Sequence, residues 1–321
     1  MKVDELVERM LGGDRVALAR LITIVENRDP EMRQVMSGIY GRAGRAFILG
    51  ITGPPGAGKS TLADRLIARL RARGSTVGVV AVDPSSPFSG GSVLGDRIRM
   101  QGHFLDEGVF IRSLSTRGRH GGLARATRDV VRLMDAFGKD VILVETVGVG
   151  QTELDIMELA DTTLVVLVPE AGDTVQVMKA GLLEIADVFV VNKADREGAD
   201  RLVGELERMI HMLPESGGWE VPVLATEAAR DVGIQELLEA VERHREHRKR
   251  NVEPDRIARA RRREVLDIVE EEIAARLRQS TDELGDVLAE VDAGRLDPYR
   301  AGEEILSDST RLGLVVTRAR R

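Results

Sequence analysis

Apolar runs alternate with amphipathic stretches from about residue 44 to residue 245. The runs predict strands near 46–52, 77–82, 109–113, 141–147, 164–168, 188–192 and 221–224. Between the first two runs, Leu62, Leu66 and Leu70 recur at helical spacing, which predicts a helix from Thr61 to Arg73. Apolar strands separated by helices predict an α/β fold with a mostly parallel sheet covered on both faces.

Helical extensions flank this region on both sides. Residues 3–40 predict short helices closing at Asp29-Pro30, and the charged break Asn251-Val252-Glu253-Pro254 ends the central domain. Beyond the break, helical spacing relates Ile257, Val265, Ile268, Ile273 and Leu277. We therefore expect an N-terminal helical extension (1–43), a central domain (44–250) and a C-terminal helical arm (251–321). The apolar stripe of the arm has to pack against its own domain or, as we prefer, against a second copy.

Composition narrows the functional classes. The 321 residues carry a net charge of −7, no cysteine and five histidines, which excludes a disulfide framework, cysteine-ligated zinc and a thiol nucleophile. No apolar run approaches the roughly 20 residues that span a bilayer, and the acidic N-terminus does not resemble a signal peptide, so we expect a cytoplasmic protein without a membrane partner. The basic run Arg243–Arg250 is interpreted as a solvated helix end, because the negative net charge argues against nucleic-acid binding.

The stretch Gly53–Ser60 reads GPPGAGKS and fits the phosphate-loop pattern G-x-x-x-x-G-K-[ST] between a strand and a helix. Its glycines let backbone N–H groups converge on phosphates, with Lys59 on the β and γ oxygens and the Ser60 hydroxyl on Mg²⁺. This predicts a P-loop NTPase fold. The expected nucleotide contacts here are Gly56, Ala57, Gly58, Lys59, Ser60 and Thr61. A chance glycine loop is the alternative.

The base is indicated by Asn192-Lys193-Ala194-Asp195, which follows an apolar run and matches the N-K-x-D guanine signature. The carboxylate of Asp195 can accept hydrogen bonds from guanine N1–H and the exocyclic amine, whereas adenine offers no such donor pair. A chance match in a helix-start turn is the alternative. The usual Ser-Ala segment that also contacts guanine appears only as Thr226-Glu227-Ala228.

Metal and switch candidates lie between these motifs. Asp83 ends a predicted strand, and Asp96 lies in a glycine-flanked segment that either moves onto the metal or is a solvated loop. Glu145 and Gly148 follow the strand near 141–147, where the Gly148 N–H can sense a γ-phosphate. Together with Lys59 they are the candidate catalytic residues. Val149, rather than a glutamine, follows this glycine, so intrinsic hydrolysis should be slow.

Three longer motifs carry a specific resemblance: Val82–Pro87, Gly90–Arg97 and Glu145–Glu153. They closely resemble the MeaB/ArgK family of GTPases, G-protein chaperones of adenosylcobalamin-dependent acyl-CoA mutases. The resemblance implies GTP or GDP as ligand, Mg²⁺ held by Ser60, Asp83 and Asp96, guanine held by Asn192, Lys193 and Asp195, a methylmalonyl-CoA mutase-type partner and a homodimer. It also implies a third mobile segment, Glu170–Lys179, in which Gln176 and Lys179 relay the nucleotide state to the mutase.

Two departures and two rival functions remain. Arg119-His120 stands where the family usually has a small hydroxyl residue and leucine, and Thr226-Glu227 stands where it tends to have Ser-Ala.

An older description of the family as arginine/ornithine transport kinases implies a phosphotransferase instead. A nucleotide-dependent targeting protein is a third possibility, but its usual Met-rich or membrane-binding segment is not evident in the sequence. We favour a regulatory GTPase that gates cobalamin loading.

Overall fold

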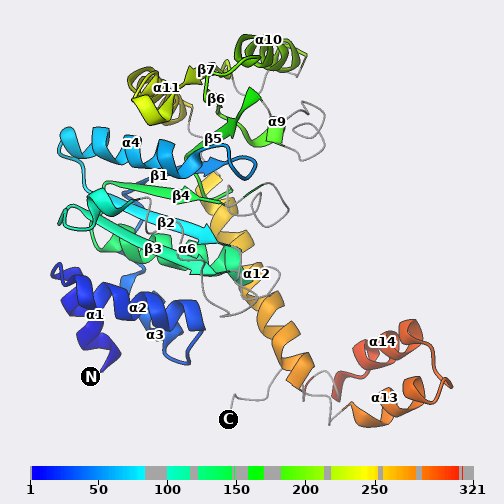
Figure 1. Cartoon of the computed structure of the whole chain (residues 1–321). Helices are drawn as coiled ribbons and strands as arrows, with labels where there is room; N and C mark the ends of the chain where they lie inside the picture. The colour runs from blue at the N-terminus through cyan, green and yellow to red at the C-terminus, as the bar shows by residue number, and fades with distance from the viewer. Residues whose placement is uncertain are drawn as a thin grey trace. The chain divides into compact units, whose positions relative to one another are not determined.

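The apolar runs form a parallel sheet in the computed structural model of the chain. The strands are β1 (Phe47–Thr52), β2 (Val77–Asp83), β3 (Val109–Ser115), β4 (Val141–Glu145), β5 (Thr162–Leu167), β6 (Val188–Asn192) and β7 (Val223–Thr226). They lie in the order β3-β2-β4-β1-β5-β6-β7, and every neighbouring pair is parallel (Figure 1). The expected α/β fold with a parallel sheet is confirmed.

The structure describes residues 2–83, 100–115, 122–146, 148, 158–169, 182–212, 218–251, 256–279, 284–310 and 313. The chain divides into two units, Met1–Arg250 and Asn251–Arg321, which are described one after the other. None of the described helices combines the length and the apolar character that a bilayer crossing requires.

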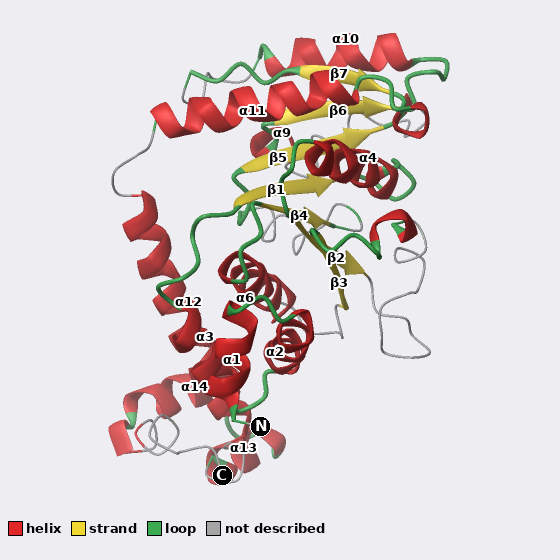
Figure 2. Ribbon diagram, turned by 90° about the vertical axis from the view of Figure 1, so that its left-hand side faces the viewer, coloured by secondary structure: helices red, strands yellow, loops and turns green. Residues whose placement is uncertain are grey.

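Helices cover both faces of the sheet because successive strand residues point to opposite sides. On one face, α4 (Lys59–Ala72) and α11 (Ile234–Arg250) share a hydrophobic core with Val79, Leu143 and Val166 (Figure 2). The adjacent residues Val80, Ile142 and Val144 belong to the core of the other face, with α1 (Val3–Leu11), α2 (Arg15–Asn27), α3 (Met32–Ile39) and α6 (Gly122–Ala136). A third cluster packs α9 (Leu182–Ile185) and α10 (Ala199–Ile210) on β5 and β6.

The N-terminal helices are fixed to the sheet by polar contacts as well as by this core. Asp14 caps α2 by accepting from the backbone N–H groups of Val16 and Ala17, at 2.8 and 3.1 Å. The guanidinium of Arg15 then donates to the carbonyl oxygens of Glu107 and Val109 at 2.7 and 2.8 Å. These bonds join the start of α2 to the start of β3, which follows the short 3-10 helix η1 (Gln101–His103).

Aspartates occupy the amino-terminal edge of the sheet and satisfy backbone N–H groups where strands begin. Asp135 accepts from Ala46 at 2.9 Å, Asp161 from Ile48 at 3.0 Å, and Asp187 from Thr163 at 2.7 Å. Nearby, Asp106 and Arg71 form a bidentate pair at 2.8 Å for both contacts, and this pairing lowers the pKa of Asp106 to about 2. The strand starts are therefore held by charge-assisted hydrogen bonds.

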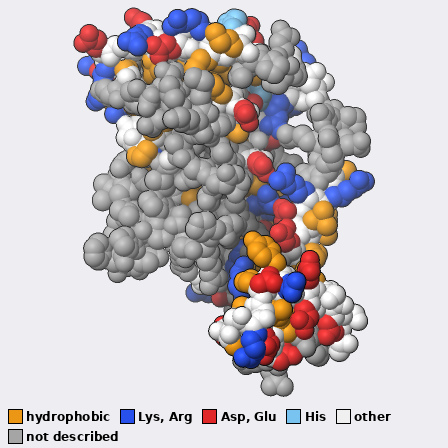
Figure 3. All heavy atoms as spheres, turned by 90° about the vertical axis from the view of Figure 1, so that its right-hand side faces the viewer, with side chains coloured by type: hydrophobic (Ala, Val, Ile, Leu, Met, Phe, Trp, Pro, Cys, Tyr) orange, Lys and Arg blue, Asp and Glu red, His pale blue; other side chains and the backbone are white. Residues whose placement is uncertain are grey.

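The second unit consists of helices in its described part: α12 (Arg256–Gln279), α13 (Gly285–Asp292) and α14 (Pro298–Ser307). Helix α14 begins with Asp297 as N-cap and Pro298 in its first turn, and α13 buries Val287. On α12, Val265 and Leu266 are 59% and 68% exposed. Hydrophobic, acidic and basic side chains are mixed on the face of α13 and α14 in Figure 3.

One buried histidine on α11 makes folding sensitive to pH. His244 is 4% exposed; its Nδ1 lies 2.8 Å from the Thr162 hydroxyl oxygen, and its Nε2 lies 3.2 Å from Asp187 Oδ1. The Trp219 ring packs on the imidazole with centroids 4.8 Å apart. Burial, reinforced by the charge of Arg248, lowers the pKa of His244 from 6.5 to about 4. The folded protein therefore holds this imidazole neutral.

We expect the free energy of unfolding to fall by about 2 kcal/mol between pH 7.5 and pH 5 through His244 alone. Its folded-state pKa lies below its unfolded value, so the stability is full above pH 6.5 and is lost as the pH falls toward 4. Urea denaturation of the wild type and of His244→Gln measures the effect. Parallel pH profiles of the two proteins would contradict it.

Candidate functional site

The phosphate loop lies at the carboxyl end of β1, in the middle of the sheet. Gly53 has φ 139°, and a Cβ there would come within 2.0 Å of the Val166 carbonyl oxygen on β5. Gly56 and Gly58 also have positive φ angles, 77° and 87°, and α4 begins directly after Gly58. The backbone can therefore turn tightly into the N-terminus of α4, where N–H groups favour an anion.

The Lys59 side chain lies against the backbone of this loop. Its Nζ donates to the carbonyl oxygens of Gly53 and Pro54 at 2.8 and 3.0 Å, and the residue is only 6% exposed. A buried ammonium requires such partners, and phosphate oxygens can replace the carbonyls when a nucleotide is bound. Thr61, the last residue of the expected phosphate-contact set, lies in the first turn of α4 and is partly exposed.

Ser60 contacts the end of β4. Its hydroxyl donates to Glu145 Oε1 at 2.7 Å, and both residues are buried. A hydroxyl and a carboxylate oxygen are the donor types that Mg²⁺ prefers, so this pair fits a magnesium site. The strand register brings Ala81 opposite Glu145, so Asp83, two residues further along β2, reaches the same edge. The described residues contain no group of three or more acidic, histidine or cysteine side chains arranged to hold a metal.

Two buried threonines link the loop to the segment after β4. Thr146 Oγ1 donates to Thr52 Oγ1 at 2.9 Å, and Thr52 Oγ1 donates to the Gly148 carbonyl oxygen at 3.0 Å. Thr52 is the residue directly before Gly53. The glycine expected to sense a γ-phosphate is therefore tied to the strand that carries the phosphate loop.

Asn192, at the end of β6, joins the phosphate loop to the segment after β7. Its Nδ2 donates to the Ala57 carbonyl oxygen at 2.8 Å. Its Oδ1 accepts from the Thr226 hydroxyl and from the Ala228 N–H, each at 3.1 Å. A Cβ on Gly58 would lie 2.4 Å from this Nδ2, so the close approach also requires glycine. All of these groups are buried, which makes each hydrogen bond costly to lose.

The rest of the guanine signature surrounds this junction. Lys193 has φ 57° and donates through Nζ to the Gly56 carbonyl oxygen at 2.8 Å. Asp195 is exposed two residues later. Thr226 is fully buried, and the Glu227 carboxylate is held by Arg230 at 3.0 Å. The residues expected to contact phosphate and guanine thus come together at one edge of the sheet, although they are up to 172 positions apart from Gly56 to Ala228.

Several predicted site residues lie outside the described residues. They are Asp96, Gln176, Lys179 and the pair Arg119-His120, together with the side chain of Asp83. Three residues that hold the site were not predicted from the sequence: Thr52, Thr146 and Arg65. The Arg65 guanidinium donates to the carbonyl oxygens of Ala228 and Ala229 at 3.2 and 3.4 Å. The position of Thr52 at the end of a predicted strand could have indicated a role in the site. Nothing in the sequence indicated that Arg65 contacts a segment more than 160 residues away.

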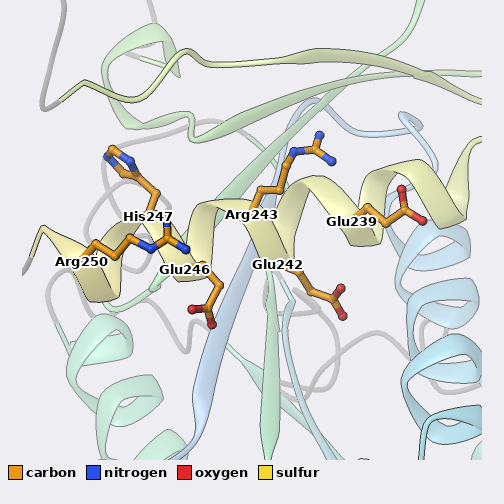
Figure 4. A pocket seen from close by; sticks show the side chains of 6 residues that line it. All are labelled: Glu239, Glu242, Arg243, Glu246, His247 and Arg250. Carbon is orange, nitrogen blue, oxygen red and sulfur yellow. The ribbon is translucent and has the colours of Figure 1, made fainter.

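A surface pocket on α11 lies apart from these residues. Its described lining consists of Glu239, Glu242, Arg243, Glu246, His247 and Arg250, and Figure 4 shows that all of them project from this one helix. Acidic and basic side chains are mixed there, and none of the labelled residues belongs to the phosphate loop or the guanine signature. The pocket therefore gives no indication of the nucleotide site.

Comparisons with known proteins agree with the geometry. A sequence model of the family described as methylmalonyl Co-A mutase-associated GTPase MeaB matches residues 18–282. A Pyrococcus abyssi protein provisionally named a GTPase is 50% identical over 323 residues, 98% of this chain and 99% of that protein. The GTPase ArgK of Escherichia coli is 37% identical over 245 residues, 74% of each chain. A solved structure of a LAO/AO transport system kinase aligns with a TM-score of 0.70 and 28% identity, over 95% of this chain and 96% of that one. The chain therefore belongs to the MeaB family of GTPases.

Proposed function

We propose that this protein binds GTP with Mg²⁺, hydrolyses it slowly, and uses its nucleotide state to gate adenosylcobalamin loading of an acyl-CoA mutase. The observation that carries the guanine part is the junction at Asn192, where the guanine signature contacts both the phosphate loop and the segment after β7. The mutase part is supported by the family description, which names a methylmalonyl-CoA mutase.

Each candidate residue has a role in this proposal. The backbone N–H groups at the start of α4 and the Lys59 ammonium bind the β and γ phosphates, and Asp195 accepts from the guanine edge. Ser60, Asp83 and Asp96 would hold Mg²⁺, which when bound neutralises charge on the phosphate oxygens. Glu145 orients the Ser60 hydroxyl, and Gly148 reports the γ-phosphate through its N–H.

The partner and the assembly belong to the same proposal. Gln176 and Lys179 relay the nucleotide state to the mutase, and the arm 251–321 joins two copies through the apolar stripe of α12, where Val265 and Ile268 are 59% and 40% exposed. The mass of the protein in solution, measured by light scattering, tests the homodimer. We place the protein in the cytoplasm, in keeping with a soluble metabolic partner.

A phosphotransferase is the second candidate. It is supported by the similarity to a solved structure titled as a transport system kinase. A kinase would pass the γ-phosphate to a small-molecule acceptor rather than to water. Release of all labelled γ-phosphate as inorganic phosphate, in the presence of arginine or ornithine, would exclude those acceptors.

The wild type should bind GDP and GTP at least about tenfold more tightly than ADP and ATP, because only guanine supplies the donor pair for Asp195. Asp195→Asn should shift this preference toward xanthine nucleotides, whose C2 oxygen accepts from the new amide. Calorimetric titration measures both effects, with Asp200→Asn on α10 as the matched control. Equal binding of GDP and ADP by the wild type would overturn the guanine assignment.

Lys59→Ala and Asp83→Ala should each lower GTP hydrolysis by about a hundredfold or more, because phosphate charge is no longer stabilised or Mg²⁺ is misplaced. Phosphate release under saturating GTP measures the rate. Lys249→Ala, which removes an exposed lysine that pairs with Glu246, is the control and should keep the normal rate. An Asp83 variant with unchanged rate and Mg²⁺ dependence would show that the metal assignment is wrong.

The isolated protein should turn over on the order of one GTP per minute or less, because Val149, and not a glutamine that orients water, directly follows Gly148. An adenosylcobalamin-dependent acyl-CoA mutase from the same organism should accelerate this turnover. Lys179→Ala should keep the basal rate and lose most of the acceleration. Steady-state GTP hydrolysis with and without the mutase measures both effects. If the mutase does not accelerate the wild type, the proposed chaperone function is wrong. If the mutase fully accelerates the Lys179→Ala variant, the proposed relay role of Lys179 is wrong.

A further inference from the structure

The segment after β7 forms a small closed loop. The Glu227 N–H donates to the Val232 carbonyl oxygen at 3.0 Å, and the Val232 N–H donates back to Glu227 at 3.3 Å. Between them lies the 3-10 helix η3 (Ala228–Arg230), followed by Asp231 in the left-handed region with φ 61°. This loop contains Glu227 and Ala228, two of the three residues in the Thr226-Glu227-Ala228 segment expected to contact guanine.

Helix α4 also holds this loop, through contacts separate from those of Asn192. Arg65 donates through Nε to the Ala228 carbonyl oxygen at 3.2 Å and through Nη2 to the Ala229 carbonyl oxygen at 3.4 Å. One turn later, the Arg69 guanidinium pairs with the Asp231 carboxylate. That second pair is more than a third exposed on both sides and so contributes little by itself. The main restraint is the pair of carbonyl contacts made by Arg65.

We propose that Arg65, supported by Arg69, is a positioning residue that sets the preference of this protein for guanine. A trans peptide is planar, so its C=O and N–H point in opposite directions. By fixing the carbonyl oxygen of Ala228, Arg65 fixes the direction of the Ala229 N–H, away from α4. The Arg230 N–H is already bonded to the Glu227 carbonyl oxygen at 2.8 Å. The Ala229 N–H can donate to guanine O6, whereas the amino group of adenine at the same position is itself a donor. The inference rests on the proposed guanine site.

The same contact links the base to the phosphates. Helix α4 begins at Lys59, and Arg65 lies six residues later, about 9 Å along the helix axis. The phosphate end and the base end of a bound nucleotide would therefore both be positioned by the same helix, α4. The planar guanidinium matters here because its N–H groups form a fixed fork, which the single ammonium of lysine cannot reproduce.

The test compares three nucleotides in calorimetric titrations of the full-length protein. Inosine diphosphate keeps O6 and N1–H but lacks the exocyclic amine, so it loses one of the two contacts expected at Asp195 while it keeps the whole contact with the loop. Arg65→Met should weaken GDP and inosine diphosphate about tenfold, the loss expected for one hydrogen bond, and change ADP binding by less than about twofold. Arg65→Lys should recover part of the loss.

Arg73→Met is the matched control, because Arg73 caps the C-terminus of the same helix but contacts Glu242 and Gln235 of α11 instead of the loop. It should bind all three nucleotides like the wild type. If the Arg65→Met protein does not fold, the same titrations are made with Arg65→Lys, and Arg73→Lys is the control. An equal loss for all three nucleotides, or no loss, would overturn the inference. A wild type that binds GDP no better than ADP would instead overturn the guanine site itself, and this inference with it.

Discussion

The amide of Asn192 is the contact on which the whole candidate site depends. Through one donor bond and two accepted bonds it joins the phosphate loop at Ala57 to Thr226, the last residue of β7, and to Ala228, just beyond this strand. Each partner is buried, so loss of this amide leaves polar groups without hydrogen bonds at about 1 to 3 kcal/mol for each group. The phosphate loop and the Thr226-Glu227-Ala228 segment therefore cannot shift independently of one another while this amide keeps its hydrogen bonds.

The two edges of the sheet are used differently. At the amino edge, Asp135, Asp161 and Asp187 bind the N–H groups of strand starts and hold the register of β1 and β5. At the carboxyl edge, the loops after β1, β4 and β6 are held to each other by side chains, with Thr52 and Asn192 at the centre. Because β1 lies between β4 and β5, the chain turns into α4 at the point where the strand order reverses, where open parallel sheets bind ligands.

Much of this arrangement could be predicted because it depends on local pattern. The strands expected near 77–82, 109–113 and 188–192 are β2, β3 and β6, since buried parallel strands are apolar throughout. The last strand was expected at 221–224 and is observed at Val223–Thr226. The Pro222 carbonyl oxygen accepts from the Phe189 N–H of β6 at 2.9 Å, but proline has no N–H to donate and the strand begins after it. The helix expected from Thr61 begins two residues earlier, at Lys59, because Gly58 supplies the turn.

The candidate residues for phosphate and guanine could be identified from the sequence, because each lies in a short motif whose spacing implies its backbone geometry: the glycines, lysine and serine of the phosphate loop, and the asparagine and aspartate of the guanine signature. The residues that those motifs contact could be identified only from the folded chain. The contacts of Asn192 with Ala57, of Ser60 with Glu145 and of Arg65 with Ala228 join residues 135, 85 and 163 positions apart. Such partners are set by strand order and helix packing, and neither can be read from a local pattern of residues.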